Sequence, residues 1–186
     1  MSCHKKWRSL QFYQEPQYFR LLLNCHRMKT QIRLATKDDL PDILRVFGSS
    51  IQAIPNAHYT QAQKLEWLKS LENKKRWTQA LTKQLFWVAE ADDELAGFIS
   101  LEVERSYIDF LYVAPNFWGQ GIAKELLQTL QDFALLNKLS GLSSDVSITA
   151  RPFFEHHGFR SNGRNEHLRG NQVLVNFSMT KVLTNT

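Results

Sequence analysis

A short segment with strand character runs into a two-glycine turn and a long helix. This feature constrains the 186-residue chain more than any other. Residues 107–113 are rich in β-branched and aromatic side chains, which favours a strand. Beyond Gly119 and Gly121, apolar residues recur at helical spacing: Ile122, Leu126, Leu127, Leu130, Phe133 and Ala134. The segment therefore predicts a strand, a tight loop and a helix that begins near Gly121.

The start of this helix has the properties of an anion-binding site. The first turn of a helix presents N–H groups without internal partners, and the helix dipole adds partial positive charge there. Glycines such as Gly119 and Gly121 let an anion approach the backbone closely. A pyrophosphate seat is one interpretation of the turn. The other is a strand–helix connection that uses glycine only for its turn geometry.

Two other phosphate-binding motifs are excluded by spacing and position. A Walker loop requires Gly-x-x-x-x-Gly-Lys-Ser/Thr, and the chain contains no such run. A dinucleotide-binding fold places its glycine fingerprint near the start of alternating strands and helices. Here the glycines come late, after several segments with strand character.

The rest of the sequence predicts an α+β domain. Apolar alternation indicates strands at residues 31–35, 85–89, 95–103 and 107–113, a short strand ending at Val146, and a last strand at 173–179. Helical spacing and caps at Thr60 and Thr149 indicate helices at residues 36–50, 60–71, 121–134 and 149–158, with another short helix at 77–83. We expect a mostly antiparallel central sheet of six to seven strands, flanked by about four helices.

The charge distribution argues against a nucleic-acid partner. The net charge is +5, but residues 1–27 hold five basic residues and one acidic residue, which leaves +1 for the remainder. Both cysteines, Cys3 and Cys25, lie in that leading segment, so the main domain lacks a disulfide framework or thiolate metal site. No apolar run is long enough to span a bilayer. We expect a soluble, cytoplasmic protein without nucleic-acid, membrane or metal binding.

Residues 1–27 differ in character from the rest of the chain. They are basic and aromatic without a clear period, whereas Met28 begins a run that leads into the first strand. We interpret 1–27 as a non-functional extension or misassigned start, and 28–186 as the functional domain. The alternative is a basic arm that contacts a membrane, a nucleic acid or a partner subunit.

From about residue 31 to 183 the sequence resembles the GNAT superfamily of N-acetyltransferases, and within it the YafP-like bacterial acetyltransferases. Each matching stretch is short, but their order along the chain is specific. The stretches are residues 58–60, 97–100, 108–113, 118–123, 147–155, 158–159 and 176–179. The family signature Gln/Arg-x-x-Gly-x-Gly/Ala falls on residues 118–123, with Trp118 where Gln or Arg is usual.

The resemblance implies acetyl-CoA as co-substrate and a sheet that splays apart to form its slot. It places the pyrophosphate on Trp118, Gly119, Gln120, Gly121, Ile122 and Ala123. It places the pantetheine arm along Leu111, Tyr112 and Val113. The implied reaction is direct transfer of the acetyl group to an amine of a small molecule or peptide. A non-catalytic acetyl-CoA sensor and transfer of another acyl group are the alternatives.

The family often carries a tyrosine as general acid five residues before the Phe of a Gly-Phe pair, and this chain has Phe154 there. Asp109, between apolar neighbours, is the best candidate for general base because it should be partly desolvated; Glu102 and Glu104 are fallbacks. An acid on the solvent side of the strand, or one paired with arginine, is the alternative.

The remaining candidates concern the leaving thiolate and the acceptor. Ser147 stands where relatives often carry Asn, and it either contacts the cofactor region or caps a helix. Tyr107 and Tyr112 are possible replacement acids or ordinary strand tyrosines. His58 and Tyr59 lie where the family places acceptor-facing elements, and a surface turn is the alternative. The acceptor and the choice between monomer and homodimer stay open.

Overall fold

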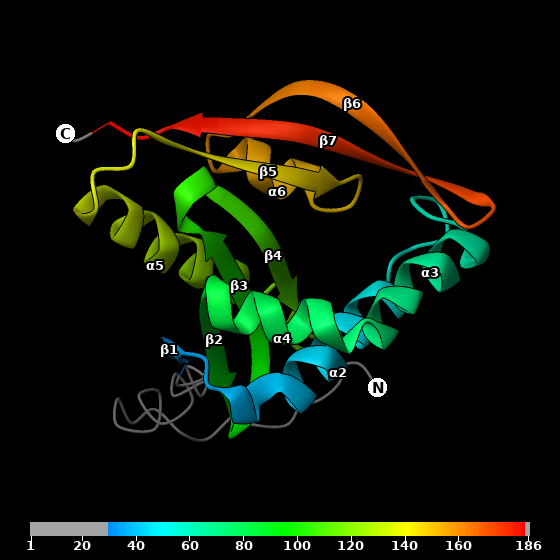
Figure 1. Cartoon of the computed structure of the whole chain (residues 1–186), viewed down its shortest axis with the longest axis horizontal. Coiled ribbons are helices and arrows are strands. Elements are labelled where there is room, and N and C mark those ends of the chain that lie inside the picture. The colour runs from blue at the N-terminus through cyan, green and yellow to red at the C-terminus, as the bar shows by residue number, and fades with distance from the viewer. Residues whose placement is uncertain (1–29, 185–186) are drawn as a thin grey trace, which may run out of the picture.

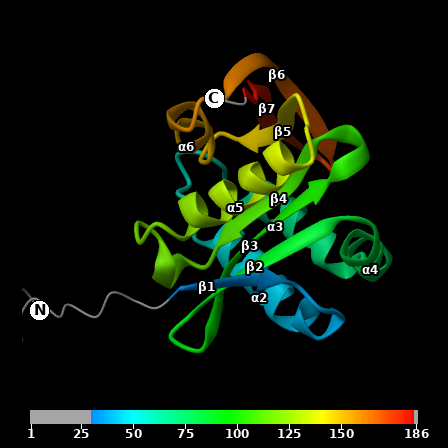
Figure 2. The same ribbon diagram turned by 90° about the vertical axis from the view of Figure 1, so that its left-hand side faces the viewer.

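The computed structural model describes residues 30–184, which form one seven-stranded sheet with helices on both faces (Figures 1 and 2). The strand order is β1-β2-β3-β4-β5-β7-β6. The strands are β1 Gln31–Leu34, β2 Leu85–Ala91, β3 Glu94–Glu102, β4 Tyr107–Val113, β5 Gly141–Ser147, β6 Arg160–Arg169 and β7 Gln172–Val182. All neighbouring pairs are antiparallel except β4 and β5, which are parallel. The predicted α+β class is confirmed. Residues 1–27 lie outside the described part of the chain.

The described residues contain five α-helices where about four were expected. They are α2 Leu40–Gln52, α3 Gln61–Leu68, α4 Lys74–Lys83, α5 Ile122–Leu136 and α6 Arg151–His156. Helix α5 covers one face of the sheet, and α2 and α4 cover the other (Figure 2). Within residues 30–184, none of the helices has the length and apolar character needed to cross a membrane.

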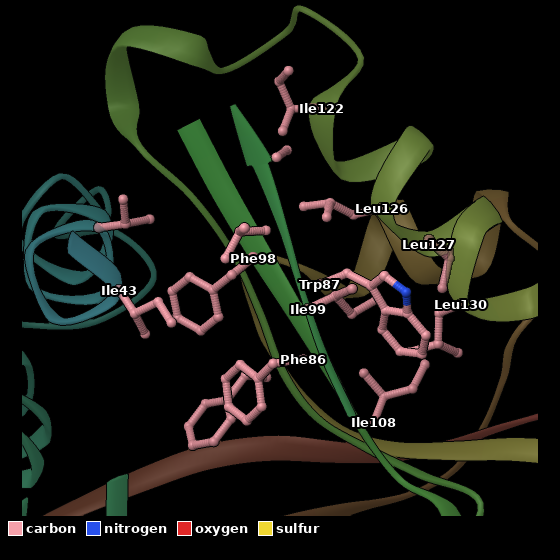
Figure 3. Close-up of a cluster of buried hydrophobic side chains, with 14 of the residues drawn as sticks. Ile43, Phe86, Trp87, Phe98, Ile99, Ile108, Ile122, Leu126, Leu127 and Leu130 are labelled. Atoms are coloured by element: carbon pink, nitrogen blue, oxygen red, sulfur yellow. The ribbon is translucent and has the colours of Figure 1, made fainter. Parts of the chain in front are cut away.

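Alternation along the central strands supplies both halves of the core. Figure 3 shows Phe86 and Phe98 on the side of α2, together with Ile43, while Trp87 and Ile99 point toward α5. On the α2 side, the ring of Phe110 stacks on that of Trp77 from α4, with centroids 4.8 Å apart. Side chains that alternate in this way bury both faces of a sheet, so these strands have few polar positions.

Strand β6 was not predicted. Its ten residues, RSNGRNEHLR, show no apolar alternation, and all but one are exposed. Strand β6 forms an edge of the sheet and pairs only with β7 through a hairpin at Gly170. Polar residues are tolerated there because an edge strand with two solvated faces needs no burial pattern.

The expected helix cap at Thr149 is wrong, whereas Thr60 caps α3 as expected. The Thr60 hydroxyl accepts a hydrogen bond from the Gln63 N–H, 3.3 Å away. Helix α6 begins only at Arg151, after Ala150. The Thr149 hydroxyl instead lies 2.9 Å from Nδ1 of His58, because the turn before α6 packs against the loop between α2 and α3.

The sheet opens between β4 and β5. These parallel strands pair only at Tyr107 with Ser143 and at Ile108 with Ser144, although both continue beyond those residues. Strand β5 pairs with β7 along its whole length instead. An irregularity on β4 coincides with the opening: Phe110 pairs with Ser100 and Ile108 with Leu101, which leaves Asp109 as the extra residue of a β-bulge. The splayed sheet implied by the family resemblance is therefore present.

Candidate functional site

The two-glycine turn lies between β4 and α5, where the sequence predicted a tight loop between a strand and a helix. Gly119 and Gly121 have φ angles of 75° and 91°, and a Cβ at either position would meet nothing within 4 Å. The first helical hydrogen bond of α5 joins the Glu125 N–H to the Gly121 carbonyl at 3.0 Å. The N–H groups of residues 122–124 precede it and lie in the first turn, where an anion is favoured. The turn has the open backbone that a pyrophosphate seat requires.

A cavity of about 480 Å³ occupies the opening between β4 and β5, and we name it the slot. Six of the nine predicted cofactor residues line the slot: Leu111, Tyr112, Val113, Trp118, Gly119 and Ala123. Gln120, Gly121 and Ile122 are not among its lining residues. Ile122 is 1% exposed and its side chain belongs to the core.

Trp118 lines the slot and is partly exposed. Its indole Nε1 donates to the Val113 carbonyl at 2.7 Å, and the buried Ser50 hydroxyl of α2 donates to the same oxygen at 2.7 Å. The side chain that replaces the usual Gln or Arg thus ties the turn to the end of β4. Ser50 was not singled out from the sequence, because a serine on an otherwise apolar helix face gives no sign of a partner 63 residues away.

A second cavity of about 220 Å³ adjoins the slot, and we name it the side cavity. It shares five lining residues with the slot: Trp67, Asp109, Tyr112, Asp145 and Ser147. Aromatic residues Phe47, Tyr59, Trp77, Tyr107 and Phe110 form much of its remaining wall. The β6–β7 hairpin, which reaches α3 in Figure 1, contributes polar residues of β6 and residues 174–176 of β7.

Asp109 lies at the junction of the two cavities, and the structure pairs it with an arginine. Its Oδ1 accepts from Nη2 of Arg76 at 3.0 Å, and its Oδ2 accepts from the Gln84 side-chain amide at 2.9 Å. The side chain is 17% exposed. Glu102 and Glu104 line neither the slot nor the side cavity. Asp109 is therefore partly buried, as the general-base interpretation expected, and paired with an arginine, as the alternative interpretation expected.

Asp145 is a functional candidate that sequence reasoning missed. It follows the last β5 residue paired with β4, as Asp109 follows the last β4 residue paired with β5. The Ser178 hydroxyl lies 2.9 Å from its Oδ1, and the Tyr107 hydroxyl donates to its Oδ2 at 3.3 Å. The only signal in the sequence was an acid next to Val146, in a strand that is otherwise small and neutral.

The tyrosines near the junction are weak acids. Burial, together with the charges of Asp145 and Asp109, raises the pKa of Tyr107 to about 12. Burial, followed by the charge of Asp109, also raises the pKa of Tyr112 far above its ordinary value. Phe154 lines the slot, is 3% exposed and carries no hydroxyl group. A thiol has a pKa of about 8.5, well below the pKa of either tyrosine. Proton transfer from either tyrosine to a thiolate is therefore unfavourable.

Ser147 and Tyr59 line the side cavity, but their hydroxyl groups already have backbone partners. The Ser147 hydroxyl accepts from the Ala150 N–H at 3.1 Å and lies where both cavities meet. The Tyr59 hydroxyl accepts from the Ile148 N–H at 2.9 Å and donates to the Val175 carbonyl. Burial raises the pKa of Tyr59, and the Ile148 hydrogen bond opposes this effect. Tyr59 therefore connects the α2–α3 loop to β7 as a wall residue.

His58 lines neither cavity and instead contacts Thr149. The structure therefore does not bring His58 together with the other predicted site residues.

Comparisons with known proteins agree with this geometry. Residues 55–181 match the family model described as the acetyltransferase (GNAT) domain. The chain is 35% identical over 131 residues to the uncharacterized N-acetyltransferase YafP of Escherichia coli (strain K12), covering 70% of this chain and 81% of that protein. Fold and relatives together define an acetyltransferase.

Solved structures give the same result. A GCN5-related N-acetyltransferase from Rhodopseudomonas palustris, titled "Aminotransferase, Class-II", superposes with a TM-score of 0.79 at 27% identity, covering 84% of this chain and 98% of that one. PaiA N-acetyltransferase from Thermoplasma acidophilum, in complex with coenzyme A, superposes with a TM-score of 0.67 at 22% identity, covering 84% and 100%. The chain belongs to the GNAT family of N-acetyltransferases.

Proposed function

We propose that this protein transfers the acetyl group of acetyl-CoA directly to an amine of a small molecule or peptide. One observation carries the proposal: the slot meets the glycine turn at Gly119 and meets the side cavity at Asp109 and Asp145. A ligand extending from the turn through the slot would bring its far end to the side cavity. An acceptor there could approach it without crossing the core.

The chain offers two kinds of backbone contact to acetyl-CoA, which supplies the acetyl group as an activated thioester. The N–H groups of residues 122–124 and the turn at Gly119 and Gly121 suit the pyrophosphate. Beyond Ile108, the edge of β4 that faces β5 has no strand partner. Leu111, Tyr112 and Val113 lie along this edge, and its unbonded backbone groups can pair with the amide groups of the pantetheine arm, as strand residues would. The Val113 carbonyl is not among them, because it accepts from Trp118 and Ser50.

We assign Asp109 as the group that takes up the amine proton, directly or through water. Attack forms a bond from nitrogen to the acetyl carbon and breaks the carbon–sulfur bond. The ammonium nitrogen loses two protons in all, one before the attack and one after it. The sulfur gains one proton from solvent, so the reaction releases one proton overall. Because a thiolate is a stable leaving group at neutral pH, the reaction does not require the missing tyrosine at Phe154.

Two measurements test this function. Acetyl-CoA at 100 times its dissociation constant should stabilise the protein by about 2.7 kcal/mol, which a thermal-shift titration detects as a raised Tm. Release of free thiol should then depend on an added amine and should equal the amount of N-acetylated product. Absence of any stabilisation by acetyl-CoA would contradict the whole proposal.

The alternative of an acetyl-CoA-binding sensor has one specific observation in its favour. Phe154 of the slot has no proton to donate, and Tyr107 of the side cavity is too weak an acid to protonate a thiolate readily. A sensor would show the rise in Tm but no amine-dependent thiol release across a broad panel of amines. The same two experiments therefore separate the enzyme from the sensor.

A further inference from the structure

Some of the charged residues that line the side cavity form ion pairs with one another or with neighbouring residues. Asp109 forms an ion pair with Arg76 at 3.0 Å, and Glu66 pairs with Lys69 at 2.7 Å. Asp145 and Arg169 also line the cavity. Neither of these two takes part in an ion pair within residues 30–184. The side cavity therefore presents one acidic and one basic group whose charges are left for a ligand to complement.

The two groups lie in different parts of the cavity. Asp145 lines both the slot and the side cavity, so its carboxylate is on the side where the acetyl group would arrive. Arg169 lines the side cavity but not the slot. It ends β6 and is paired with Gln172 across the hairpin turn, whose Gly170 packs against Glu66 of α3. Aromatic side chains such as Trp67 and Tyr59 form the wall of the cavity.

Resting on the proposed function, we propose that the acceptor is a small zwitterion that carries an amine and a carboxylate. Its ammonium group binds Asp145 before proton loss, and its carboxylate binds the guanidinium of Arg169. The planar fork of an arginine matches a carboxylate in a bidentate arrangement. A volume of about 220 Å³ is below the range of about 300–1,000 Å³ that is typical for drug-sized ligands. Free amino acids and short ω-amino acids are the acceptors of this size and charge pattern.

A matched acceptor panel tests the proposal. Each α- or ω-amino acid is compared with the amine that remains when its carboxylate is removed, for example β-alanine with ethylamine. Thiol release and product formation are measured at saturating acetyl-CoA. We expect kcat/KM for the preferred amino acid to exceed that of its decarboxylated partner by about 10- to 100-fold, the effect of one hydrogen bond to a charged group.

Two variants locate the recognition. Arg169→Gln should raise KM for the preferred amino acid while leaving kcat little changed. The ratio of kcat/KM for the amino acid to kcat/KM for its decarboxylated amine should therefore approach one. Arg160→Gln is the matched control, because Arg160 is an exposed arginine on the same strand that lines neither cavity. Asp145→Asn should raise KM for both members of each pair, since both carry the ammonium group.

The outcomes separate this inference from the function on which it rests. The zwitterion proposal is wrong if amines without a carboxylate have the same kcat/KM as the amino acids. It is also wrong if Arg169→Gln leaves the ratio of the two kcat/KM values unchanged. In both cases the proposed N-acetyltransferase activity stands. If acetyl-CoA raises Tm but no amine or amino acid releases thiol, the proposed reaction itself fails and the acceptor proposal falls with it. Thermal unfolding of each variant confirms that it is folded.

Discussion

Asp109 and Asp145 occupy matching positions on β4 and β5, each directly after the last residue that pairs the two strands, but their surroundings differ. Asp109 is the extra residue of a bulge and is held by Arg76 and Gln84. Asp145 has only hydroxyl donors, from Tyr107 and Ser178, among its side-chain partners in residues 30–184. A carboxylate without a cation attracts an ammonium group, whereas a carboxylate already paired is fixed in position. This difference supports assigning the two aspartates different roles.

The first prediction concerns Asp109. Asp109→Asn should lower kcat by roughly 10²- to 10⁴-fold, the usual effect of losing a general base, and should leave KM for acetyl-CoA little changed. Steady-state kinetics between pH 5 and 9 provide the measurement. Asp132→Asn, an exposed acid of α5 that lines neither cavity, is the control. A kcat close to that of the unchanged protein would show that Asp109 is not the base.

At the scale of elements, the pairing of β5 decides where the sheet opens. Strand β5 keeps seven paired positions with β7 but only two with β4. It therefore stays in the sheet while it diverges from β4, and the edge of β4 is exposed along the slot. Helix α5 begins beside that edge because only residues 114–118 separate β4 from the turn at Gly119 and Gly121.

The second prediction concerns Gly121, which has a φ of 91° and adopts a left-handed conformation. Gly121→Ala should destabilise the protein by about 1–2 kcal/mol through backbone strain. It should also weaken acetyl-CoA binding, because the new methyl group stands in open space beside the first turn of α5. Gly163→Ala is the control, since a Cβ there also meets nothing within 4 Å and the backbone has no positive φ. Equal Tm and affinity for both variants would contradict the anion seat.

The third prediction concerns the contact that joins β1 to the start of α2. Hydrogen bonds from Arg33 lower the pKa of Asp39 to about 2. Because this pKa is lower in the folded state, the ionised carboxylate stabilises the fold at pH values above about 3.9, the pKa of the unfolded chain. This contribution is lost as the pH falls toward 2. Its size is about 2 kcal/mol. Urea unfolding should show this loss, and Asp39→Asn should reduce the slope of stability against pH in that window. An unchanged slope would contradict the assignment.

At the scale of the whole molecule, four segments that are separated in the chain meet at the side cavity. They are α3 and α4, the open ends of β4 and β5, and the β6–β7 hairpin (Figure 1). Tyr59 joins two of them through its hydrogen bonds to Ile148 and Val175. The acceptor site that we propose therefore depends on tertiary packing, whereas the glycine turn of the proposed cofactor seat lies within one continuous segment.

The fourth prediction concerns residues 1–27, which precede the region that matches the family model. We expect a chain that begins at Met28 to fold with the same Tm and to keep its kcat/KM. Soluble expression, thermal unfolding and the thiol-release assay provide the comparison with the full-length protein. Loss of soluble expression or of activity would show that the leading segment has a structural or functional role.

The sequence by itself determined the elements whose signal is local. The alternation around Phe98, the helical spacing after Gly121 and the cap at Thr60 each depend on residues close together in the chain, so pattern alone identified them. The family resemblance added the predicted cofactor residues, because they lie in two short continuous stretches, residues 111–113 and 118–123.

Only the tertiary structure decided which polar side chains share a cavity. Asp145 and Arg169 are separated by 24 positions and have no common pattern in the sequence. They line the same cavity because β5 pairs with β7 and β7 returns along β6. The predicted candidate His58 lies outside that cavity for the same kind of reason, since its loop packs against Thr149. Hydrophobic periodicity records which residues are buried, but it does not record which distant polar residues are brought together.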